Sequence, residues 1–168
     1  MHKFERVYMR TLRHVYDTEK QLQSALPALE AAAADPRLVR AVSDIARQSR
    51  DQADRLERLF ALLYLEPQAD PSWVASALLR EAHDSSTGVH QGGPQGTAAA
   101  LLALKRYEIT LYEALLRWSE QCELVEAIGD LRRSIAEELV QASVLSELAF
   151  CEDSSEMLPA EPEALALH

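Results

Sequence analysis

The stretch Thr97–Glu123, TAAALLALKRYEITLYEALLRWSEQCE, decides the fold of this chain. Residues spaced alternately by four and three positions form one stripe along a single helix face. Lys105 and Glu108 interrupt that stripe near its middle, one turn apart, so the spacing predicts that both side chains point where the apolar residues point. The stripe consists of Leu101, Lys105, Glu108, Tyr112, Leu115, Ser119 and Cys122.

Each of the other long apolar stripes also carries polar residues near its middle. The set comprises Glu19, then Gln48, Ser49 and Gln52, then Glu138 and Gln141. Carboxylate metal sites in four-helix bundles follow this plan, because a cation in an apolar core needs several anionic oxygens. Here three carboxylates accompany several amides and one ammonium. Two simpler interpretations stay open: the acids lie at the edge of the surface if the stripes are rotated by one residue, and Lys105 reaches solvent.

Composition favours one all-α domain. Of 168 residues, 48% are hydrophobic and only 5 are glycine. A net charge of -10 with no basic block argues against nucleic acid or anionic membranes as main partners. No apolar run approaches the length of a membrane span, and the first residues lack the apolar core of a signal peptide. We therefore expect a soluble cytoplasmic protein.

The hydrophobic period predicts long helices over about 3–33, 36–64, 97–123 and 125–151, with a shorter helix over about 71–83. Pro27 should kink or divide the first helix, and Asp35-Pro36 should cap and begin the second. The glycine-rich residues 84–96 should form a loop. The domain then spans residues 1–151, as two helical hairpins joined by a long crossover with its own short helix. Residues 152–168 form an acidic tail with no strong apolar period, which we expect to be mobile.

Several segments resemble one family, in the same helix order. They are the run VYDTEKQ from Val15 with the later Ala25-Leu26-Pro27, Gln52-x-x-Arg55-Leu56-Glu57-x-x-Phe60, Arg106-Tyr107-Glu108-Ile109-x-x-Tyr112, Glu137-Glu138, and Ser146-Glu147-Leu148-Ala149. This pattern is similar to the YciE/YciF-type ferritin-like stress proteins. The resemblance implies a cytoplasmic, ferritin-like four-helix bundle, often dimeric, with a proposed di-metal site and no firmly established reaction.

The departures from that family fall on the proposed site. Where relatives tend to have a histidine and an acidic pair before a threonine, this chain has Ile45, Arg47, Gln48 and Ser49. On the third long helix the expected acid and histidine are Lys105 and Arg106, and on the fourth a later acid is Ala142. Only Glu19, Glu108 and Glu138 carry over as candidate metal ligands.

We interpret the chain as a family member whose di-metal centre has become a buried salt-bridge network that contains Gln48, Gln52, Lys105 and Gln141. No catalytic residue and no cofactor are expected, and the protein would act as a structural or protein-binding module. The alternative is an oxidoreductase or metal-storage bundle that holds iron or manganese through the remaining glutamates. A homodimer is expected from the resemblance, and from apolar residues on more than one helix face at Leu101, Leu102 and Leu104.

Overall fold

The computed structural model describes residues 3–89 and 92–150, with side chains from residue 5 onward. The described chain forms five α-helices. Their bounds are α1 (Lys3–Ala32), α2 (Pro36–Leu62), α3 (Trp73–Ser86), α4 (Gly93–Gln121) and α5 (Val125–Phe150). The all-α fold predicted from the sequence is confirmed. None of the described helices is both long enough and apolar enough to cross a membrane.

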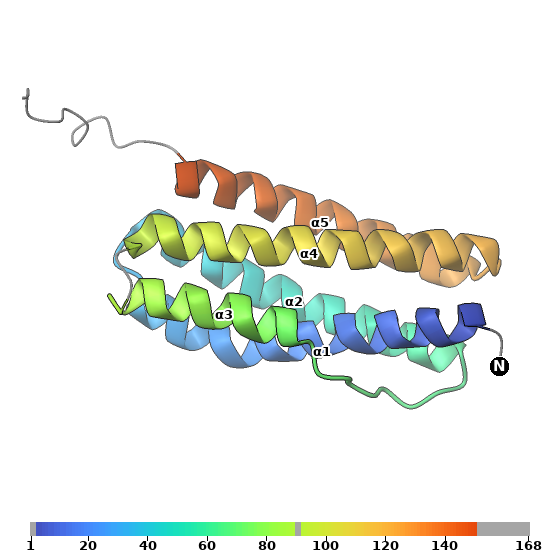
Figure 1. Ribbon diagram of the computed structural model, residues 1–168. Helices are drawn as coiled ribbons and strands as arrows, with labels where there is room; N and C mark the ends of the chain where they lie inside the picture. The colour runs from blue at the N-terminus through green and yellow to red at the C-terminus, as the bar shows by residue number, and fades with distance from the viewer. Residues whose placement is uncertain (1–2, 90–91, 151–168) are drawn as a thin grey trace, which may run out of the picture.

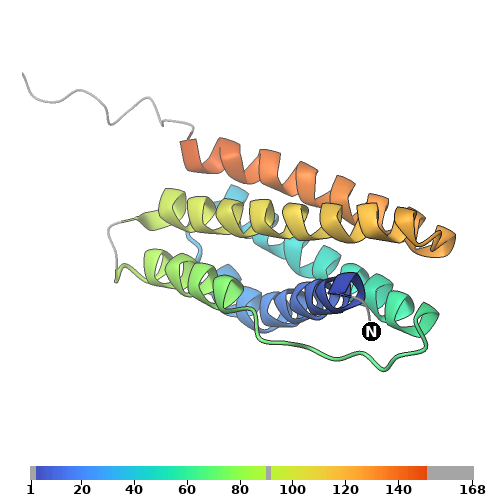
Figure 2. The same cartoon turned by 45° about the vertical axis from the view of Figure 1, so that its right-hand side comes forward.

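Four long helices form the bundle, and their order around it places the site (Figure 1). α1 and α2 make one antiparallel hairpin, and α4 and α5 make the other. The contacts α2–α5 and α1–α4 close the bundle. The connection after α2 returns along the bundle and includes α3, which packs against α4 and α1 (Figure 2). The predicted pair of hairpins with a long crossover that carries a short helix is therefore confirmed.

The helix boundaries show the local causes of the fold. Asp35 is the N-cap of α2, since its carboxylate accepts a hydrogen bond of 2.7 Å from the Arg37 amide, and Pro36 follows in the first turn. Pro27 lies inside one continuous α1, so it does not divide that helix. The loop expected at residues 84–96 is shorter, because α3 runs to Ser86 and α4 already begins at Gly93.

Small residues at the junction of α3 and α4 explain that shorter loop. A Cβ atom on Gly92 would lie 2.9 Å from Ser85 Oγ, and one on Gly96 would lie 3.0 Å from it. A side chain at either position would therefore require Ser85, near the end of α3, to shift. Gly93 has a φ of 52°, a left-handed conformation in which glycine costs little. The glycines thus serve a close helix–helix contact as well as a turn.

Two apolar clusters make up the core, one toward each end of the bundle. The first includes Leu22, Leu26, Ile45, Leu101, Leu104 and Leu145. The second includes Leu12, Val15, Leu56, Phe60, Leu115 and Leu131. Leu101 and Leu104 are fully buried, whereas Leu102 is partly buried and packs against the first cluster. The polar residues predicted for the helix centres fall between the two clusters.

Candidate functional site

A buried polar layer separates the two halves of the core. Glu19, Glu108 and Glu138 have no solvent-exposed surface, and Lys105 is 1% exposed. α1 supplies Glu19, α4 supplies Lys105 and Glu108, and α5 supplies Glu138. These four residues interrupt the apolar stripes at mid-helix, and the packing of the stripes carries all of them inward. The interpretations that place the acids at the surface or Lys105 in solvent do not describe this structure.

The ammonium group of Lys105 joins two of these acids. Its Nζ atom lies 2.9 Å from Glu108 Oε2, one turn along α4, and donates a hydrogen bond of 3.0 Å to Glu138 Oε1 on α5. Burial disfavours the charged lysine, but the Glu108, Glu138 and Glu19 carboxylates outweigh that cost and raise the pKa of Lys105. The charged form of Lys105 is therefore favoured at the centre of the bundle.

Glu19 is held by two hydroxyl groups. Tyr112 on α4 donates a hydrogen bond of 2.7 Å to Oε1, and Ser49 on α2 donates one of 2.7 Å to Oε2. Ser49 Oγ also lies 3.0 Å from the backbone carbonyl oxygen of Glu19. Burial raises the pKa of Glu19 to about 7, although the charge of Lys105 opposes this shift. Burial and the nearby Glu19 charge also raise the pKa of Tyr112 well above its usual range.

If all four groups of the layer are ionised, their charges do not balance, because three carboxylates surround one ammonium. Burial, reinforced by the charge of Glu138, raises the pKa of Glu108 well above its usual value. Neither Glu108 oxygen has a hydrogen-bond partner among the described residues, nor has Glu138 Oε2, although Glu108 Oε2 is in ion-pair contact with Lys105. The raised pKa values of Glu19 and Glu108 favour their protonated forms, and bound protons reduce the excess negative charge of the layer.

The amides predicted for the network lie beside it. Gln52 is fully buried, but its Nε2 atom donates 3.2 Å to Glu137 Oε2, an acid outside the layer. The Oε1 atoms of Gln48, Gln52 and Gln141 have no hydrogen-bond partner within the described chain. The hydrogen bonds that Glu19 and Glu138 accept come from Ser49, Tyr112 and Lys105 and not from these amides. The hydroxyls of Ser49 and Tyr112 take that role at Glu19.

Sequence reasoning missed a second ionic cluster next to the layer. The guanidinium of Arg55 is 6% exposed and forms two hydrogen bonds of 2.6 and 2.8 Å with the Glu137 carboxylate. It also donates 3.1 Å to Ser134 Oγ. Arg55 lowers the pKa of Glu137 against the opposing effect of burial. The signal was present, since Arg55 follows Gln52 by one turn on the inner face of α2.

The residues of the layer do not fit a di-metal centre. The Lys105 ammonium occupies the position between Glu108 and Glu138 that a cation would share with them. Within the described residues no histidine contributes to the layer, and no group of three or more His, Cys, Asp or Glu could hold a metal ion. Ferritin-like di-metal sites take carboxylates from all four helices, whereas α2 offers Ser49 and Gln52 here.

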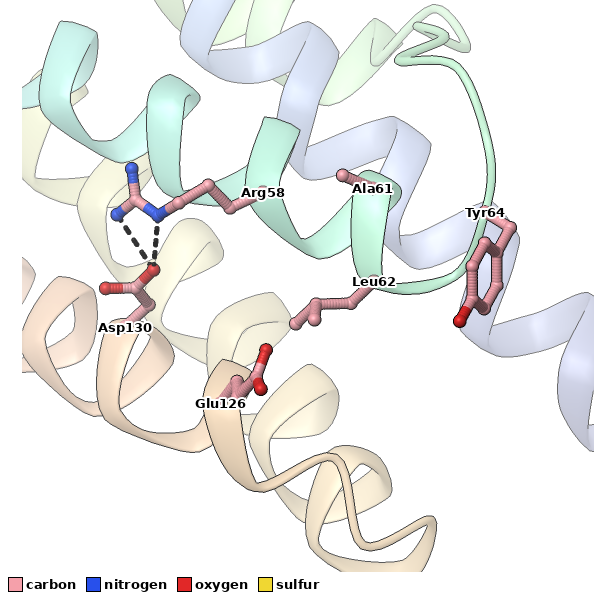
Figure 3. A pocket seen from close by; sticks show the side chains of 6 residues that line it. All are labelled: Arg58, Ala61, Leu62, Tyr64, Glu126 and Asp130. Carbon is pink, nitrogen blue, oxygen red and sulfur yellow. Dashed lines mark hydrogen bonds and ion pairs between the residues drawn. The ribbon is translucent and has the colours of Figure 1, made fainter.

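A surface pocket near one end of the bundle is lined by residues outside the buried layer. This pocket of about 440 Å³ lies between the end of α2 and the start of α5 (Figure 3). Arg58 and Asp130 form an ion pair of 2.8 Å across it, and Tyr64 and Glu126 complete its rim. None of the four charged residues of the layer lines it.

Two solved structures have folds similar to that of this chain. The E. coli stress protein YciF superposes with a TM-score of 0.80 at 24% identity, covering 89% of this chain and 96% of that one. A protein described as "YcfI, a putative structural protein from Rhodopseudomonas palustris" gives a TM-score of 0.79 at 24% identity, covering 86% of this chain and 94% of that one. No curated protein matches the chain.

The YciE/YciF-type relationship predicted from the sequence is confirmed by these structures together with a family match. The family model covers residues 3–155, which is most of the chain. The chain belongs to the family described as "Domain of unknown function (DUF892)".

Proposed function

We propose that this protein is a ferritin-like stress-family bundle whose di-metal centre is replaced by the Lys105 network, and that it acts as a structural or protein-binding module. The observation that carries this proposal is the Lys105 Nζ atom, 2.9 Å from Glu108 and 3.0 Å from Glu138. The stress role is suggested by YciF and the structural role by YcfI, as these relatives are described.

Electrostatics supports a metal-free layer. A divalent cation about 4 Å from the ammonium would be repelled by roughly 8 kcal/mol at an effective dielectric constant of about 20. Two of the acids that would compensate for this repulsion, Glu108 and Glu138, are already paired with Lys105. Lys105 supplies the positive charge that joins α4 to α5, and Tyr112 and Ser49 tie Glu19 on α1 to α4 and α2. The network stabilises the bundle without a cofactor.

Self-association is the binding activity that the surface favours. Leu139, Val140 and Val144 on α5 are 47%, 60% and 38% exposed, which makes an unpartnered apolar face on one helix. Arg133 and Glu147 each lie seven residues, or two turns, from Val140. If two copies of α5 cross antiparallel at Val140, Arg133 faces the partner's Glu147 and the reverse holds by symmetry. This charge complementarity supports a homodimer through α5.

Metal binding through the three glutamates is the second candidate. One observation favours it: Glu108 and Glu138 have oxygen atoms without hydrogen-bond partners among the described residues. A metal-storage or oxidoreductase bundle would require these oxygens to bind iron or manganese. Lys105 would have to leave the layer for that to happen.

Metal analysis distinguishes the two candidates. The full chain is purified without chelator, its iron and manganese are measured, and it is melted with and without added Mn²⁺ or Fe²⁺. We expect far less than one metal per chain and an unchanged Tm. The variant Lys105→Glu serves as a positive control, since a fourth carboxylate should lower the Tm without metal and make it respond to metal. Stoichiometric iron or manganese in the unmodified protein would support the second candidate and overturn the first.

A further inference from the structure

A surface groove on the face opposite α5 is not used by the buried network. It runs between the N-terminal half of α1, the start of α3 and the middle of α4, and it encloses about 710 Å³. In Figure 1, α1 and α3 lie below α4. The lining of the groove combines large apolar side chains with basic ones.

The apolar part of the groove is unusually exposed. Trp73, the first residue of α3, is 78% exposed, and its neighbour Val74 is 47% exposed. Val7 on α1 adds a third apolar side chain, 45% exposed. A tryptophan on the surface beside other apolar residues marks a contact site, because aromatic side chains contribute much of the energy of protein interfaces. Here none of the described elements covers Trp73.

The charged part of the groove has one sign. Arg6, Arg10 and His14 lie four residues apart on one face of α1, and the Arg10 Nε atom donates 3.3 Å to His14 Nε2. Among the residues that the structure describes, no acidic side chain lines the groove. This is notable in a chain with a net charge of -10, since acidic side chains dominate its composition. The groove therefore suits an acidic segment that also carries apolar side chains.

We propose that this groove binds the C-terminal segment of the same chain, residues 151–168. That segment has the matching chemistry, with five acidic residues and no lysine or arginine, and with apolar side chains among them. The acidic residues are Glu152, Asp153, Glu156, Glu161 and Glu163, and the large apolar ones are Met157, Leu158, Leu165 and Leu167. The segment would cover Trp73 and pair with Arg6 and Arg10.

The segment is long enough to reach. α5 ends at Phe150 at the end of the bundle where α4 begins (Figure 1). Tyr107, in the groove, lies 14 residues beyond Gly93, or about 21 Å along α4. One helix width adds about 10 Å, so the path takes about ten extended residues at roughly 3.3 Å each. The remaining residues, from about 161 onward, include two acids and two leucines that can occupy the groove.

Fluorescence of Trp73 tests this in the full chain. The protein has two tryptophans, so Trp118→Phe leaves Trp73 as the only reporter. Acrylamide quenching is compared between this background, the same chain with Arg6→Glu and Arg10→Glu, and the same chain with Glu161→Arg and Glu163→Arg. A tethered segment has an effective concentration near the millimolar range, so docking should protect Trp73 roughly twofold from quenching. Each charge reversal should remove that protection, as should high salt.

Combining both charge reversals should restore the protection, because the attraction then forms with opposite signs. Arg47→Glu with Arg50→Glu, two exposed positions on α2, is the matched control and should change nothing. Equal quenching in all these proteins would overturn the proposal. Protection that grows with protein concentration would also overturn it, since the occupant would then be a second copy. Circular dichroism confirms that each variant is folded, and the outcome does not depend on whether Lys105 has replaced a metal.

Discussion

Lys105 Nζ lies 3.0 Å from Glu138 Oε1, and this contact joins α4 to α5 across residues that are 33 positions apart in the chain. Both side chains are buried, so the contact exists only because each helix brings a polar residue to the same depth. A buried charge is tolerated when its partner is present and becomes very unfavourable when the partner is removed.

Replacing Lys105 with methionine should destabilise the protein by about 3–5 kcal/mol at neutral pH, because the buried carboxylates lose their cation. The folded-state pKa values of Glu19 and Glu108 then rise further above their unfolded values. Stability linked to such groups is complete below the unfolded pKa and lost as pH rises, so the deficit should shrink toward pH 5. Urea unfolding at several pH values measures it.

Lys20→Met is the matched control for that experiment. Lys20 makes an exposed ion pair of 3.4 Å with Glu57, and such pairs contribute about 0–1 kcal/mol. A Lys105→Met protein as stable as the Lys20→Met protein at every pH would contradict the central role given to Lys105.

The helices and the polar layer could be predicted from the sequence for a simple reason. The helical period decides which residues share a face, so the spacing favoured an interior position for Glu19, Lys105, Glu108 and Glu138, although a rotation of the stripes by one residue would have placed the acids at the surface. Partner choice could not be predicted, because it depends on which helices are neighbours and how they are rotated. Tyr112 and Glu19 are 93 residues apart, and their hydrogen bond follows from the contact between α1 and α4.

The partner of the Gln52 amide could not be predicted for the same reason. Gln52 shares the inner stripe of α2 with Ser49, which placed it in the predicted buried network. Its rotation instead turns Nε2 toward Glu137, beside the Arg55 guanidinium. A residue on the inner stripe of a helix can point its side chain toward either neighbouring helix. Only the packing of the helices decides which of the two it contacts.

Glu19→Gln should remove a pH-dependent part of the stability. The pKa of Glu19 is raised to about 7, so the folded state holds a proton there that the unfolded state has lost. Stability of the unmodified protein should therefore fall by about 1 kcal/mol between pH 6 and pH 8 as that proton is released. The glutamine variant should lack this fall, because its side chain does not titrate. Parallel stability–pH curves for the two proteins would show that Glu19 does not titrate in this range.

Tyr112→Phe should cost about 1–3 kcal/mol, the scale of leaving a buried acceptor without its donor. In the unmodified protein, the hydrogen bond of 2.7 Å from Tyr112 favours the charged form of Glu19. Its loss should therefore raise the pKa of Glu19 in the variant. The fall in stability with pH should then move to a higher pH. Tyr64→Phe is the control, since Tyr64 is 97% exposed and should tolerate the change.

Charge reversals on α5 should reveal the proposed homodimer. Arg133 is 70% exposed and lies 3.3 Å from Glu137, which leaves its charge accessible to a second copy. Arg133→Glu alone should place two acids together at each end of the crossing, and Glu147→Arg alone should place two bases together. Each should weaken the dimer, and the double variant should restore it, because the pairs then form with exchanged signs.

Val140→Glu should give a monomer, since it places two carboxylates at the apolar centre. Sedimentation velocity over a range of micromolar concentrations measures the dissociation constant. A protein that is already monomeric, or a dimer unaffected by all four variants, would show that α5 is not the interface.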